Sequence, residues 1–195
     1  MSAPKLCQQL WRKALESTAT MVLPAPILPM KGIRLYPSFI SMLEESWFLD
    51  TLGKEGIALP VKGAISRHED DLYTEEMWFC VDALHKRVNQ PNLKYTSSAT
   101  LYGSDITQHA LCPNRVVTAY VLALGLDAIL KCTPEGSAHE QTVPVVIPVP
   151  GRSLCIVNES VFLSYHVAWN QCPKASVELY SLIPTQSWGT FADPE

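Results

Sequence analysis

The sequence predicts an α+β chain that is mainly β, built as a double-stranded β-helix (jelly roll). Two observations predict this class: about eight short β-type runs follow one another after residue 91, and helical periodicity is confined to the part before it. Fifteen prolines against nine glycines favour short extended segments and turns over a helical bundle. We therefore expect the strands to form the roll and the helices to buttress one of its sheets.

The first thirty residues indicate an arm that precedes a jelly-roll domain spanning residues 31–195. Helical spacing of apolar residues predicts an amphipathic helix in the first twenty, and three prolines in residues 22–30 predict a stiff connector. We expect this helix to pack little against its own domain and to dock on another protein subunit. A cleaved mitochondrial targeting segment is the alternative. The apolar face consists of Leu6, Leu10, Trp11, Ala14 and Leu15.

Each element of the domain follows from a local pattern. A short strand is expected at residues 33–36, and a helix over 41–52, which Ser41 caps and Gly53 ends. A second helix is expected over 74–88, where apolar residues recur at helical spacing. Turn residues then separate the β-type runs. These runs are residues 94–101, 106–111, 116–124, 128–131, 142–149, 153–157, 161–167 and 175–183.

The composition excludes several classes of protein. Only 17% of residues are charged, 47% are hydrophobic and the net charge is −4, which excludes a disordered regulator and a polybasic nucleic-acid binder. RNA contact is therefore only weakly supported. The longest apolar stretch, of 15 residues, is interrupted by Gly125 and Asp127, so no membrane span is expected. Six cysteines without a C-x-x-C pair indicate buried thiols in a reducing compartment, the mitochondrial matrix or the cytoplasm.

Four stretches, in order, resemble the AlkB-like family of Fe(II)/2-oxoglutarate-dependent dioxygenases. They are residues 32–40 (GIRLYPSFI), 102–109 (YGSDITQH), 123–130 (ALGLDAIL) and 151–166. The resemblance covers residues 32–183 and implies the jelly-roll fold, with Fe(II) and 2-oxoglutarate as the family's cofactors. It also implies that His109 and His166 match the two iron-binding histidines, and that Tyr102 is a vestigial cofactor-binding residue.

The sequence departs from that family at two positions. The metal-binding carboxylate, two residues after the first histidine, corresponds to Leu111, which has no lone pair to give a metal. The last strand lacks the arginine that would hold 2-oxoglutarate, and it carries Glu178, which would repel a dicarboxylate. We therefore expect no catalytic residue and no bound cofactor. The rings of His109 and His166 are expected to face each other inside the roll, on adjacent strands, as a vestigial metal site.

Two other routes to a metal site stay open. Chloride could take the place of the carboxylate, although Leu111 fills that gap instead of opening it. Alternatively, Cys112 or Asp105 could supply a displaced third ligand, in a site better suited to zinc than to iron.

The sequence favours a catalytically inactive AlkB-like domain, a pseudoenzyme that acts as a structural or assembly subunit of a larger mitochondrial or ribonucleoprotein complex. Its partners would be other protein subunits, reached through the N-terminal arm. The alternatives are an active Fe(II)/2-oxoglutarate dioxygenase that demethylates nucleic acid or protein, and a nucleic-acid-binding module without a reaction.

Overall fold

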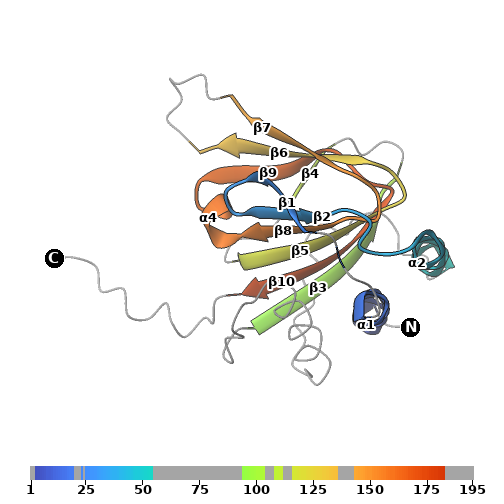
Figure 1. Ribbon diagram of the computed structural model, residues 1–195. Helices are drawn as coiled ribbons and strands as arrows, with labels where there is room; N and C mark the ends of the chain where they lie inside the picture. Colours follow the sequence, from blue (N-terminus) through green and yellow to red (C-terminus); the bar gives the residue numbers. More distant parts are fainter. Residues whose placement is uncertain are drawn as a thin grey trace.

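A computed structural model describes residues 3–19, 23, 25–54, 94–103, 108–111, 116–135 and 143–182. These residues form two antiparallel sheets, with two helices outside the larger sheet (Figure 1). The larger sheet has the order β1 (Ile27–Met30), β2 (Ile33–Tyr36), β8 (Leu154–Asn158), β5 (Val116–Leu124), β10 (Ala175–Leu182) and β3 (Lys94–Leu101). The smaller sheet has the order β4 (His109–Ala110), β9 (Tyr165–Gln171), β6 (Ala128–Pro134) and β7 (Val145–Val149).

Strands β3 to β10 pair as one long ribbon folded back on itself. β6 pairs with β7, β5 with β8, β4 with β9, and β3 with β10. The ribbon is rolled up so that the β3/β10 and β5/β8 pairs lie in the larger sheet and the other two pairs lie in the smaller one. Eight strands connected in this way make a double-stranded β-helix. The predicted fold class is confirmed.

Alternating side chains divide the apolar core into two parts. Along β5, Tyr120, Leu122 and Leu124 face the helices, whereas Val121 and Ala123 face the smaller sheet. The larger sheet is therefore buried on both faces, which agrees with the nearly continuous apolar sequence of β5.

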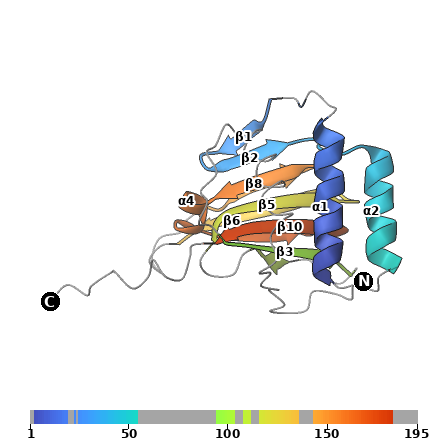
Figure 2. The same cartoon turned by 90° about the horizontal axis from the view of Figure 1, so that it is seen from below.

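The N-terminal helix α1 (Ala3–Ala19) packs on the larger sheet of its own chain. Leu10, Trp11 and Ala14 are fully buried, in the same core cluster as Phe39 and Leu122. Figure 2 shows the helix lying across the strands of the larger sheet, with α2 beside it. The prediction that the arm packs little against the roll is wrong.

The burial of α1 has a physical reason and a consequence for the arm. The predicted apolar face matches the apolar outer face of the larger sheet, which water would otherwise contact. Because this face is already covered, it is not free to dock on another subunit. Cleavage of a targeting segment would likewise uncover the sheet.

In the connector, Ile27 and Leu28 are exposed in the edge strand β1, a position where Pro29 removes no internal ladder bond.

Helix α2 (Met42–Lys54) begins as predicted. The backbone N–H of Glu44 donates to the Ser41 hydroxyl (3.3 Å), and the backbone N–H of Ser41 donates to the Glu44 carboxylate (2.9 Å). This reciprocal pair is a capping box. Phe48 and Leu52 then bury the inner face of the helix. The helix predicted over 74–88 lies outside the described residues.

One predicted strand is partly wrong. Residues 161–167 were expected to be extended, but α4 (Glu159–Phe162) occupies the first part and β9 begins at Tyr165. The short helix carries the chain from the larger sheet to the smaller one, and Val161 is buried against the β1–β2 turn. A Cβ on Gly32 in that turn (φ 90°) would lie 2.6 Å from a Val161 methyl group, so only glycine fits there.

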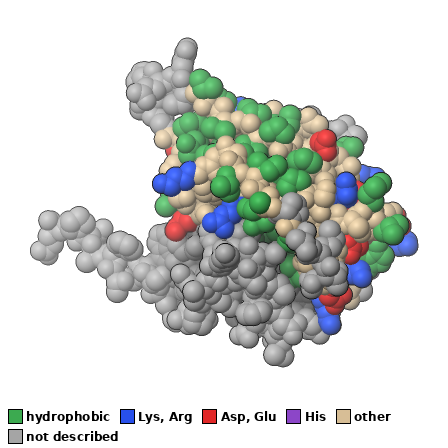
Figure 3. Space-filling model, viewed as in Figure 1, with side chains coloured by type: hydrophobic (Ala, Val, Ile, Leu, Met, Phe, Trp, Pro, Cys, Tyr) green, Lys and Arg blue, Asp and Glu red, His purple; other side chains and the backbone are tan. Residues whose placement is uncertain are grey.

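The surface carries few charged side chains. On the face seen in Figure 3, isolated blue and red side chains lie among many apolar ones. Neither α1 nor α2 is long and apolar enough to cross a membrane, and the same holds for α4.

If α1 is part of the core, removing its central side chain should destabilise the whole domain. Trp11→Ala is expected to lower the free energy of unfolding by about 3–5 kcal/mol, because a large buried ring is lost. Gln9→Ala, on the exposed face of the same helix, should change it by less than about 0.5 kcal/mol. Urea unfolding followed by circular dichroism measures both. Equal, small effects would mean that α1 is not held by the sheet.

Candidate functional site

The candidate site lies inside the roll, where β4 and β9 face the larger sheet. His109 pairs with Trp169 across these strands, and the backbone N–H of Leu111 donates to the carbonyl of Val167 (3.0 Å). Directly paired residues of antiparallel strands point to the same face. Leu111, Val167 and Trp169 are buried in the core between the sheets, so His109 also points inward.

His166 points the other way. It is exposed and pairs with Thr133 of β6. The neighbour of Thr133 along that strand, Cys132, is buried and faces inward. Trp169 follows His166 by three positions, an odd number, and side chains alternate along a strand, so the two face opposite sides of the sheet. The expected adjacent strands are present, but the prediction that the two histidine rings face each other inside the roll is wrong.

The described side chains around His109 do not make up the ligand set of a facial iron site. Of the two histidines, only His109 faces inward, and the inward positions next to it hold Leu111 and Val167, which have no lone pair. A facial site needs two histidines and one carboxylate on one face. Among the described residues no group of three metal-binding side chains comes together. Asp105 and Cys112, the alternative ligands, lie outside the described residues.

A buried polar cluster faces the same interior from β10. The hydroxyls of Ser176 and Tyr180 donate to the two carboxylate oxygens of Glu178, at 2.9 and 2.5 Å. The hydroxyl of Tyr102 lies 3.2 Å from that of Ser176. Glu178 is only 4% exposed, so its carboxyl group is enclosed among these hydroxyls. The described residues of the last strand contain no arginine.

Tyr102 joins this cluster to His109. The rings of Tyr102 and His109 make an edge-to-face contact, with centroids 5.5 Å apart. Burial raises the pKa of Tyr102, and the nearby charge of Glu178 raises it further. The structure therefore brings together Tyr102, His109 and Leu111 of the predicted site and leaves His166 outside. Tyr102 stays a neutral hydrogen-bonding group, which suits packing better than acid–base chemistry.

Three free cysteines line the same interior. Burial raises the pKa of Cys132 to about 11 and that of Cys172 to about 11. Burial also raises the pKa of Cys155 to about 12, and the neighbouring Cys132 adds to the rise. A thiol with a raised pKa carries little thiolate, the reactive form. These side chains therefore act as small apolar residues, as predicted for buried thiols.

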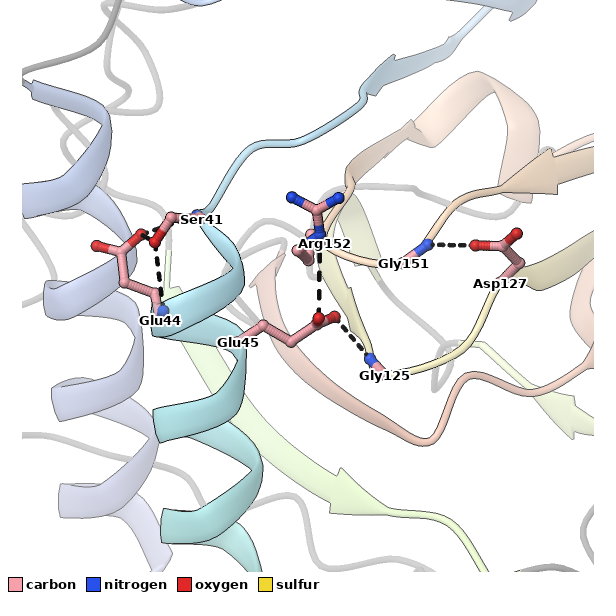
Figure 4. A network of polar contacts seen from close by, with 7 residues as sticks. All are labelled: Ser41, Glu44, Glu45, Gly125, Asp127, Gly151 and Arg152. Carbon is pink, nitrogen blue, oxygen red and sulfur yellow. Dashed lines mark hydrogen bonds and ion pairs between the residues drawn. The ribbon is translucent and has the colours of Figure 1, made fainter.

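Glu45 of α2 fastens the helix to the turns at one end of the roll (Figure 4). Its carboxylate accepts a hydrogen bond from the backbone N–H of Gly125 (2.8 Å) and lies 3.9 Å from Nε of Arg152. Asp127 accepts from the backbone N–H of Gly151 in the next turn (2.9 Å). The contacts link α2, the β5–β6 turn and the β7–β8 turn.

Glu44, the neighbour of Glu45, fastens α2 to α1. Its carboxylate accepts hydrogen bonds from the hydroxyls of Ser17 (2.6 Å) and Ser41 (2.7 Å). Burial alone would raise the pKa of Glu44, but the bonds from Ser17 and Ser41 and the charge of Lys13 hold it below its ordinary value. Adjacent acids in the first turn thus hold α2 from two sides.

Most of these polar contacts were not predicted from the sequence. A local pattern indicates some of them, whereas others depend on residues far apart in the chain. Ser176, Glu178 and Tyr180 alternate along a strand, so period two places all three on one face. Nothing local to residue 45 indicates its contacts with Gly125 and Arg152, since 80 residues separate Glu45 from Gly125.

Comparisons with known proteins give a likeness in shape but none in sequence. No protein-family model matches the chain, and no curated protein matches it. A prolyl-4-hydroxylase from Pseudomonas putida superposes with a TM-score of 0.45 at 11% identity, covering 93% of this chain and 95% of that chain. A Trichoplax adhaerens prolyl hydroxylase, solved with a hypoxia-inducible-factor peptide, gives 0.46 at 12% identity, with 97% and 96% covered.

A third solved structure is similar to the same degree. It is an oxidoreductase of the 2OG-Fe(II) oxygenase family from Burkholderia pseudomallei, with a TM-score of 0.45, 12% identity, and 88% and 89% of the two chains covered. At this level of likeness the strand order described above carries the assignment of the fold. Neither the two hydroxylases nor this oxidoreductase is described as AlkB-like, and the AlkB resemblance remains a prediction from sequence.

The raised pKa values of the buried thiols predict how their rate of alkylation depends on pH. At a pH of about 8, a thiol with a pKa of about 11 is ionised to roughly one part in a thousand. Cys132, Cys155 and Cys172 should therefore react far more slowly with iodoacetamide in the folded chain than in urea. Raising the pH toward the folded-state pKa should speed the reaction. Peptide mapping by mass spectrometry measures each site; rapid labelling of the folded chain near neutral pH would contradict this account of the core.

Proposed function

We propose that the chain is a catalytically inactive double-stranded β-helix domain that serves as a structural or assembly subunit of a larger complex. The observation that carries this proposal is the register of β4 against β9. It sets Leu111 against Val167 at the inward positions next to His109, and it turns His166 outward. The described side chains of the roll support packing, and no three of them come together as metal ligands.

The cluster around Glu178 supports the same proposal independently. The carboxylate of Glu178 is enclosed and already accepts hydrogen bonds from Ser176 and Tyr180, so this strand presents a packed polar cluster to the interior where a dicarboxylate co-substrate would need an arginine. The loss of the iron and 2-oxoglutarate sites would then be linked, because neither is useful without the other. An active dioxygenase is the competing function, and the inward position of His109 is the observation that favours it.

The buried thiols and the integrated α1 suit an intracellular, reducing compartment, in the mitochondrial matrix or the cytoplasm. We infer that α1 is retained in the working protein, because its removal would uncover the larger sheet. Partner subunits would then contact surfaces other than the apolar face of this helix.

Anaerobic titration with ferrous iron and 2-oxoglutarate tests the loss of activity. We expect no metal-to-ligand charge-transfer band from the folded protein, since the described residues bring no second histidine and no group of three metal-binding side chains to His109. Circular dichroism of the same sample controls for folding. A band that saturates at one iron per chain would overturn the inactive assignment.

Rebuilding the site tests the register itself. Leu111→Asp should give no cobalt(II) binding, because His166 is out of reach on the other face. The double variant Leu111→Asp with Val167→His should bind cobalt(II), since it places a carboxylate and a second imidazole beside His109. Ligand-field absorption of cobalt(II) measures both variants. Binding by the single variant that is lost again when His166→Gln is added would show that His166 does reach the interior.

A further inference from the structure

We draw no further inference here: the strongest candidate, the exposed apolar face of α2 formed by Met42, Leu43 and Trp47, carries no proposal because nothing in the structure shows what covers it.

Discussion

The alternation of side chains along β10 is the constraint on which the rest of the structure depends. This strand lies between β5 and β3 in the larger sheet, and its side chains from Ala175 to Tyr180 are buried on both faces. Ala175, Val177 and Leu179 meet the core beneath α1, and Ser176, Glu178 and Tyr180 face the smaller sheet. A slip of one residue would expose Glu178 to the apolar core under the helix and turn Val177 into the polar cluster.

The same alternation explains why the helices and the interior are coupled. The outer residues of the larger sheet need an apolar cover, which α1 supplies, and the adjacent acids of α2 hold the helical layer in place. With that layer fixed, the inner residues face the smaller sheet in one register. The identity of the side chains at the inward positions then determines the chemistry, because the fold itself accommodates both metal sites and plain cores.

Local signals were enough to predict most strands, since each is bounded by turn residues and needs no distant information. The strands 94–101 and 116–124 have the predicted bounds. The surface on which α1 packs was not predictable in the same way, because an amphipathic pattern reveals an apolar face without indicating which surface will cover it. The direction of His166 was predictable from its own neighbours: Val167 and Trp169 alternate with polar residues at 166 and 170. The family resemblance favoured the opposite face, and the unrecognised helix α4 concealed where the strand begins.

His109 and His166 lie on adjacent strands but on opposite faces of the smaller sheet, and this placement keeps the two imidazoles from sharing a metal. Nuclear Overhauser spectra of the histidine ring protons, assigned with His166→Gln, test it most directly. We predict contacts between the rings of His109 and Tyr102 and none between His109 and His166, and we expect a soluble paramagnetic chelate to broaden the His166 signals much more than those of His109. A direct contact between the two imidazole rings, with both shielded from the chelate, would contradict it.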